Sequence, residues 1–90
     1  MADTQRKRLI YRAWHRGTRE MDMILGRFAD AHVGEMDEDA LLQFDDLLKE
    51  SDPDIYNWIT QREKPPANVH SAVLAQVIDM FDAHHRDTEI

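Results

Sequence analysis

Residues 36–59, MDEDALLQFDDLLKESDPDIYNWI, decide the fold class of this 90-residue chain. Asp37 is a good helix-capping residue, and Met36 before it can pack against Leu41 one turn inside the helix. The apolar positions that follow have spacings of three and four and are Leu41, Phe44, Leu47 and Leu48. This spacing predicts a helix with one buried face that begins after Asp37.

The same stretch ends one helix and begins another at Ser51-Asp52-Pro53-Asp54. We expect Asp52 to be the N-cap and Pro53 to take the first helical position, with the Asp54 carboxylate at the positive end of the helix dipole. The inner face of this helix is predicted to consist of Ile55, Trp58 and Ile59. We interpret Trp58 and the Asp52–Asp54 turn as determinants of the fold.

Towards the N-terminus, the pattern predicts two helices at about residues 5–15 and 18–33, separated by Gly17. We expect Gly17 to end the first helix in the left-handed conformation, which glycine adopts at little steric cost, and Gly34 to end the second. The apolar faces of the two helices are predicted to contain Leu9, Ile10, Ala13, Trp14, Met21, Ile24, Leu25, Phe28, Ala29 and His32.

Towards the C-terminus, Lys64-Pro65-Pro66 breaks the helical pattern and predicts a stiff, extended connection. Asn68 is expected to cap a fifth helix that ends near His85, followed by a frayed tail at about residues 86–90. Its buried positions are predicted to be Val73, Val77, Met80 and Phe81. The whole chain, residues 1–90, is therefore predicted to be one small all-α domain, a bundle of five short helices.

The composition excludes several classes of protein. Apolar residues make up 42% of the chain and charged residues 32%, which is typical of a globular domain. The chain contains no cysteine, which excludes disulfides, thiolate nucleophiles and thiolate zinc sites. No apolar run approaches the length of a membrane span, and no signal-peptide core follows the N-terminus. We expect a soluble intracellular domain without membrane insertion.

The net charge of −7 conceals a strong asymmetry along the chain. Residues 1–19 contain six basic side chains against one acid, a net +5, whereas residues 20–90 contain five bases against seventeen acids, a net −12. The two ends should therefore prefer different partners. The basic end could be a solvated helix face, a nucleic-acid or membrane surface, a presequence-like helix or a docking face for a protein.

The sequence predicts no catalytic residue and no metal site. Ser51 and Ser71 lie at apparent helix boundaries, where capping explains them better than nucleophilic attack. The neighbours His84 and His85 point about 100° apart on a helix, so they cannot easily chelate one ion. His32 is interpreted as a histidine at a helix end rather than as a metal ligand.

The cluster Arg16-Gly17-Thr18-Arg19-Glu20 permits two interpretations. It can be a structural turn in which Gly17 ends one helix and Glu20 favours the dipole of the next. It can equally be a recognition site, because glycine allows close approach and arginine binds carboxylate or phosphate with two parallel hydrogen bonds. Residue chemistry leaves both interpretations open.

At this cluster the sequence resembles a known family. Residues 11–22, YRAWHRGTREMD, resemble the R-G-x-x-E signature of the flavinylation factors for succinate dehydrogenase, and residues 52–59, DPDIYNWI, resemble the second signature of that family. The resemblance covers about residues 6–82. The chain departs from the family at His15, where arginine is frequent, and after Trp58, where Glu63-Lys64-Pro65 follows instead of a frequent glycine.

The resemblance implies an assembly factor, not an enzyme, that binds the flavoprotein subunit of succinate dehydrogenase, or of fumarate reductase, and promotes covalent attachment of FAD. FAD would belong to the partner, with no cofactor bound stably here. The expected compartment is the bacterial cytoplasm rather than the mitochondrial matrix, because no separate presequence is apparent, and the free factor is expected to be a monomer. The alternative is a nucleic-acid-binding or regulatory module. The predicted partner-binding residues are Arg8, Tyr11, Arg12, His15, Arg16, Gly17, Arg19 and Glu20.

Overall fold

The chain folds into a small helical bundle, seen in the computed structural model, which describes residues 2–69 and 71–88 and the side chains of 3–69 and 71–84. Within these residues there is no strand, and the all-α prediction is confirmed. The elements are α1 (Ala2–Trp14), α2 (Arg19–His32), the short 3-10 helix η1 (Val33–Glu35), α3 (Glu38–Leu48), α4 (Asp52–Ile59) and α5 (Ala72–Thr88).

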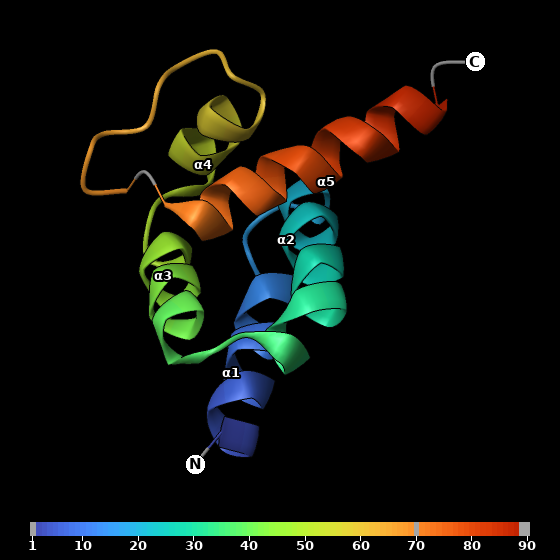
Figure 1. Cartoon of the computed structure of the whole chain (residues 1–90). Coiled ribbons are helices and arrows are strands. Elements are labelled where there is room, and N and C mark those ends of the chain that lie inside the picture. Colours follow the sequence, from blue (N-terminus) through green and yellow to red (C-terminus); the bar gives the residue numbers. More distant parts are fainter. Residues whose placement is uncertain (1, 70, 89–90) are drawn as a thin grey trace.

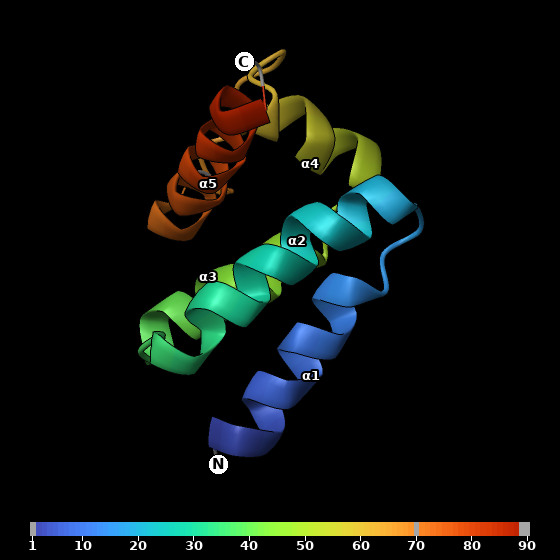
Figure 2. The same cartoon turned by 90° about the vertical axis from the view of Figure 1, so that its right-hand side faces the viewer.

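The helices pack in a simple arrangement (Figures 1 and 2). Helices α1 and α2 lie side by side as a hairpin, and α3 packs against α1. Helix α5 crosses the bundle and contacts α2, α3 and α4. No helix in the described part of the chain is long and apolar enough to span a membrane.

The core is apolar and contains side chains from all five helices. Phe28 and Phe44 are fully buried, with ring centroids 5.5 Å apart, and join α2 to α3. Met36 and Leu41 are both buried at the start of α3, as the sequence predicts, and Asp37 Oδ1 accepts a hydrogen bond from Ala40 N at 2.8 Å. His32 is half-buried at the end of α2 and its ring packs against Phe28, so it is a boundary residue as predicted.

Helix α1 packs against α2 at Gly26. The indole ring of Trp14 covers this glycine, and a Cβ atom added there would lie only 2.2 Å from Trp14 Cδ2. Trp14 Nε1 also donates to Asp30 Oδ1 at 3.2 Å, which fixes the ring on α2. Gly26 therefore provides the space that the indole fills, a role that the sequence analysis missed.

Several predicted helix boundaries are wrong. Helix α1 begins at Ala2 rather than near residue 5, and α5 extends to Thr88 rather than ending near His85. The last two residues, 89–90, lie outside the described part of the chain.

Two predicted caps are also wrong, each because a nearby serine caps the helix instead. Ser51 Oγ accepts from Asp54 N and caps α4, which makes Asp52 the first helical residue. Ser71 Oγ accepts from Leu74 N at the start of α5, where Asn68 was expected to be the cap. The interpretation of Ser51 and Ser71 as capping residues is thereby confirmed, and serine is as good a cap as aspartate or asparagine.

Helix α4 ends with a glycine-like turn at a residue that is not glycine. Gln61 has φ of 62°, in the left-handed region. Arg62 N donates to Asn57 O at 2.9 Å and Gln61 N to Trp58 O at 3.1 Å, the hydrogen-bond pattern of a Schellman C-cap. The helix therefore has a regular C-cap, and Gln61 occupies the position that usually holds glycine.

We expect Gln61→Gly to stabilise the protein by about 1 kcal/mol, because glycine adopts the left-handed conformation without the cost that a Cβ atom imposes. The substitution loses only a long contact from Gln61 Nε2 to Asp82 Oδ2, at 3.4 Å. Thermal unfolding measures the effect, and Gln61→Ala is the control because it removes the same contact but keeps the Cβ atom. Equal stability of the two variants would contradict the strain at Gln61.

Candidate docking surface

The Gly17 loop (residues 15–18) joins α1 to α2, and Arg16 anchors it to the junction between α3 and α4. The Arg16 guanidinium donates three hydrogen bonds: from Nε to Asp52 Oδ1 at 2.8 Å, from Nη1 to Leu48 O at 2.6 Å and from Nη2 to Glu50 O at 2.7 Å. Only 12% of the Arg16 side chain is exposed. Arg16 therefore serves the fold, and its three engaged nitrogens face inward.

The backbone of the Gly17 loop is also held by side chains from other elements. Gly17 N donates to Asp52 Oδ2 at 3.0 Å, and Arg16 N donates to Asp22 Oδ1 at 2.5 Å. Thr18 caps α2, since its Oγ1 accepts from Met21 N at 3.2 Å. With hydrogen bonds to α2 and α4, the loop is ordered before any partner arrives.

The predicted reason for Gly17 is wrong, although its position at the end of α1 is correct. No described glycine has a positive φ, so the turn does not require the left-handed conformation. A Cβ atom at Gly17 would instead lie 3.2 Å from Asp52 Oδ2, a tight contact. Glycine is suited to this position because it lets the Asp52 carboxylate reach the backbone amide.

The predicted partner-binding residues fall into two groups. Arg12 and Arg16 bind acceptors within the fold, and Arg12 Nη1 lies 2.5 Å from Asp45 Oδ1 on α3. The remaining six residues are exposed; they are Arg8, Tyr11, His15, Gly17, Arg19 and Glu20. Partner binding by any of the eight stays a prediction; Arg16 is largely covered, with 12% of its side chain exposed, whereas 39% of the Arg12 side chain is exposed.

Tyr11 in α1 and His15, the first residue of the Gly17 loop, form an exposed stacked pair. Their ring centroids are 3.9 Å apart, and 64% of Tyr11 is exposed. His15 Nδ1 lies 2.7 Å from the carbonyl oxygen of Tyr11, which can only accept, so Nδ1 is the donor in this bond. The pair presents an aromatic surface that connects the last turn of α1 to the Gly17 loop.

The basic N-terminal segment is partly structural. Of its six basic side chains, three donate to acceptors elsewhere in the fold, since Arg6 binds the carbonyl of Val33 in addition to the contacts of Arg12 and Arg16. Three others are exposed, namely Lys7, Arg8 and Arg19. The charge of the segment therefore both holds the bundle together and provides a smaller basic surface.

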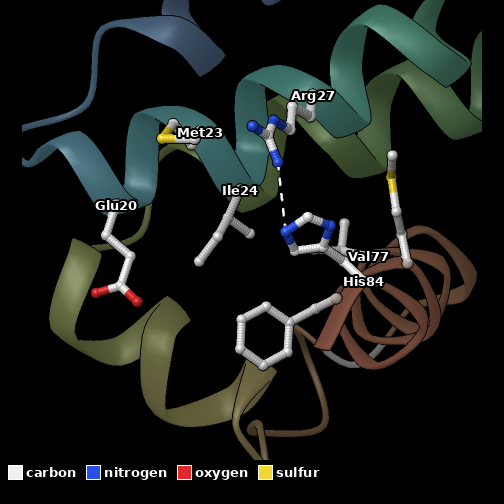
Figure 3. Close-up of a pocket in the computed structure, with 8 residues that line it drawn as sticks. Glu20, Met23, Ile24, Arg27, Val77 and His84 are labelled. Atoms are coloured by element: carbon white, nitrogen blue, oxygen red, sulfur yellow. Dashed lines mark hydrogen bonds between the residues drawn. The ribbon is translucent and has the colours of Figure 1, made fainter. Parts of the chain in front are cut away.

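A groove of about 240 Å³ separates α2 from α5 beside the start of α2 (Figure 3). Its walls are mostly apolar, and Ile24 points into the space in the close-up. Glu20 stands at one end of the groove, while Arg27 Nη1 lies 3.5 Å from His84 Nε2 at the other. The complete lining is Glu20, Met23, Ile24, Arg27, Val77, Met80, Phe81 and His84.

The pKa of Asp45 is lowered by the basic side chains around it. The hydrogen bond from Arg12 lowers the pKa below the ordinary value of 3.8, and the charges of Arg12 and Lys49 act in the same direction. Because the folded pKa is lower than the unfolded pKa, the pair stabilises the fold above pH 3.8, and this stability is lost as the pH falls through the folded pKa.

We therefore expect Asp45→Asn to lose less stability than the native protein when the pH falls from about 6 to about 3. Urea unfolding at the two pH values measures the difference. Asp46→Asn is the matched control, because Asp46 has only Lys49 as an ion-pair partner among the described residues, at 3.6 Å. If the Asp45 variant and the native protein lost the same unfolding free energy between the two pH values, the proposed contribution of the Arg12–Asp45 pair to stability would be contradicted.

Fold and surface together define a small helical protein whose accessible features are an ordered loop, a basic face and an apolar groove, rather than an enclosed site. Among the residues whose placement is given, no group of three or more His, Asp or Glu side chains could hold a metal ion. Such an arrangement is suited to contact with another macromolecule.

Comparison with known proteins gives the family. Residues 7–85 match the family model described as "Flavinator of succinate dehydrogenase". The chain is 38% identical over 72 residues to the mitochondrial succinate dehydrogenase assembly factor 2 of Dictyostelium discoideum, a match that covers 80% of this chain and 51% of that protein. It is 33% identical over 90 residues to the protein of the same name from Meyerozyma guilliermondii, covering 98% and 67% of the two chains.

A third relative, with the same name, comes from Penicillium rubens and is 47% identical over 58 residues, which cover 64% of this chain and 19% of that protein. The chain therefore spans about half of the Dictyostelium protein and about a fifth of the Penicillium protein, and about two thirds of the Meyerozyma protein. It belongs to the succinate dehydrogenase flavinator family, as the two sequence motifs predict, and this family consists of assembly factors rather than enzymes.

The predicted compartment is contradicted by the same comparison. The sequence favoured the bacterial cytoplasm, whereas the relatives are named as mitochondrial proteins and point to the mitochondrion. The prediction failed because it used the apparent absence of a presequence, which says nothing about where relatives of the same domain act.

Proposed function

We propose that this chain binds the flavoprotein subunit of succinate dehydrogenase and promotes the covalent attachment of FAD to a histidine of that subunit. The observation that carries the proposal is the Gly17 loop, which is exposed yet fixed by hydrogen bonds from its backbone to Asp22 and Asp52. A loop that is ordered before binding loses little conformational entropy on docking. Family membership supports the same function.

The factor acts on the conformation of its partner rather than on a bond. FAD belongs to the flavoprotein, and docking favours the subunit conformation in which flavin and histidine are aligned. The chain itself needs no catalytic side chain for this role, and the free factor is monomeric in this proposal. The flavoprotein of fumarate reductase is a second partner that the same face would serve.

The exposed residues have separate roles in docking. Gly17 allows the partner backbone to approach closely, and Glu20 in the first turn of α2 provides a directional acceptor beside it. Arg8 and Arg19 attract an acidic surface of the flavoprotein and mainly speed the encounter. Tyr11 and His15 add an exposed aromatic surface, a type enriched at binding hot spots.

We expect Glu20→Gln to weaken binding to the flavoprotein subunit by roughly tenfold, because hydrogen bonds to a charged group contribute about 1.5–3 kcal/mol. Calorimetry with the purified subunit measures the dissociation constant. Glu38→Gln is the matched control, since Glu38 is an exposed acid in the first turn of α3 and loses the same helix-dipole contribution.

The same binding assay separates this proposal from the nucleic-acid alternative. The native chain should bind the flavoprotein subunit and bind duplex DNA only weakly at physiological salt, because Arg12 and Arg16 are engaged within the fold. Strong, salt-sensitive binding to DNA without binding to the flavoprotein would overturn the proposed function.

A further inference from the structure

Asp52 connects α4 to the Gly17 loop through both oxygens of its carboxylate. Oδ1 accepts from Arg16 Nε at 2.8 Å, and Oδ2 accepts from Gly17 N at 3.0 Å. Only 19% of the Asp52 side chain is exposed, so the carboxylate lies mainly behind the loop rather than on the outer surface. One side chain thus fixes both the arginine and the glycine of the R-G-x-x-E motif.

The Asp52 side chain is not needed to cap its own helix. Ser51 is the N-cap of α4, and its Oγ accepts from Asp54 N at 3.3 Å. Asp54 also lies in the first turn and supplies a second negative charge to the positive end of the helix dipole. Neighbouring residues therefore supply both the N-cap and a negative charge at the start of α4. The contacts of the Asp52 carboxylate are made with the Gly17 loop instead.

Arg16 extends this connection to the end of α3. Its other two donors bind the carbonyl oxygens of Leu48 and Glu50, at 2.6 and 2.7 Å. Leu48 is the last residue of α3, where carbonyl groups lack partners within the helix and a cation is favourable. The position of the Gly17 loop is consequently set by the α3–α4 junction, which lies more than thirty residues later in the sequence.

We infer that Asp52 is a positioning residue for partner docking, which holds Arg16 and the Gly17 amide so that the Gly17 loop presents one fixed shape to the flavoprotein. This inference rests on the proposed function. The inference connects the two sequence signatures of the chain, because Asp52 from the second signature holds Arg16 and Gly17 from the first in position. Arg16 then contributes to docking through the loop and not through a contact of its own with the partner.

The first test concerns the free protein. In Asp52→Asn we expect amide hydrogen exchange at Gly17 to become about tenfold faster, because one carboxylate acceptor and the charge that holds Arg16 are lost. Circular dichroism should remain native, since Ser51 and Asp54 still start α4. Asp54→Asn is the matched control, because it removes an acid from the same helical turn without touching the loop, and exchange at Gly17 should stay unchanged.

The second test measures binding to a purified flavoprotein subunit of succinate dehydrogenase. Asp52→Asn and Arg16→Lys should each raise the dissociation constant about tenfold above that of the native chain. The double variant should raise it by no more than about thirtyfold, because both changes break one shared connection. Independent effects would instead multiply to about a hundredfold. Asp54→Asn should bind within about twofold of the native chain. Measurement well below the unfolding temperature of every variant excludes a loss of binding through global unfolding.

Each outcome tests either the positioning role of Asp52 or the proposed function. Native exchange at Gly17 in Asp52→Asn, or native affinity in a folded Asp52→Asn variant, would overturn the positioning role. Multiplicative effects in the double variant would overturn it as well. Failure of the native chain to bind the subunit would overturn the proposed function, whereas the exchange measurement would still test the positioning role. If Asp52→Asn does not fold, Arg16→Lys tests the same connection through its affinity, because it breaks the hydrogen bond from Arg16 Nε to Asp52 Oδ1.

Discussion

Gly17→Arg should abolish flavinylation while leaving the helical content nearly unchanged. The backbone at Gly17 does not use a positive φ, so an arginine needs no strained backbone, and the one tight contact of its Cβ atom is with the end of the Asp52 side chain. The residue is also exposed, which leaves room for a long side chain in solvent. The helices on either side should therefore form as in the native chain.

The loss of function has two physical causes. A bulky cation occupies the point at which the partner backbone must approach, and its guanidinium competes with Arg16 for the Asp52 carboxylate, 3.2 Å from the new Cβ atom. Blocking a binding hot spot typically costs 2 kcal/mol or more, which corresponds to roughly a thirtyfold loss of affinity. Fluorescence of covalent flavin on a denaturing gel measures the result in cells.

Gly34→Arg is the matched control for this experiment. Gly34 is also exposed, and a Cβ atom there meets no atom within 4 Å, so the variant adds the same charge away from the loop. It should support normal flavinylation. Full covalent-flavin fluorescence in the Gly17→Arg strain would show that the Gly17 loop does not dock.

The second large effect is on stability, at Gly26. We expect Gly26→Ala to destabilise the fold by about 2 kcal/mol and to lower the unfolding temperature by roughly 10 °C. The added methyl group would lie 2.2 to 2.6 Å from three atoms of the Trp14 ring, so the whole indole must move. Its hydrogen bond to Asp30 and the packing of α1 on α2 are then lost together.

Whether Gly26→Ala lowers or raises the stability of the protein distinguishes the effect of packing from the effect of helix propensity. Alanine in a helix interior is ordinarily more favourable than glycine by about 0.5–1 kcal/mol, so propensity alone predicts stabilisation at Gly26. Gly34→Ala adds the same methyl group in open space and should be neutral or slightly stabilising. A Gly26→Ala variant with a higher unfolding temperature than the native protein would contradict the packing described here.

The sequence was sufficient for the fold class because each helix carries its own periodic apolar face. The buried residues of α3 and α4 were predicted because Leu41, Phe44, Ile55 and Trp58 repeat at helical spacing. Helix ends were less certain, since Ser51 and Asp52 are equally good caps and only the folded chain shows which one is used.

The sequence predicted which residues belong to the candidate site, but it did not predict which contacts they make with one another. Charge and motif identified Arg16, yet nothing local shows that its acceptors come from the α3–α4 junction. Gly26 carried a usable signal, because a glycine inside an otherwise strong helix often marks close packing. Its partner, Trp14, is twelve residues away on another helix, and this pairing depends on tertiary structure.

The most direct test of the docking account is a reconstitution from purified components. The flavoprotein subunit of succinate dehydrogenase without covalent flavin is mixed with FAD, with and without the native chain, and flavin that resists denaturation is measured over time. The account predicts that covalent flavin forms at least about tenfold faster with the native chain, and that Asp52→Asn gives a smaller acceleration than Asp54→Asn. Equal rates with and without the chain would contradict it.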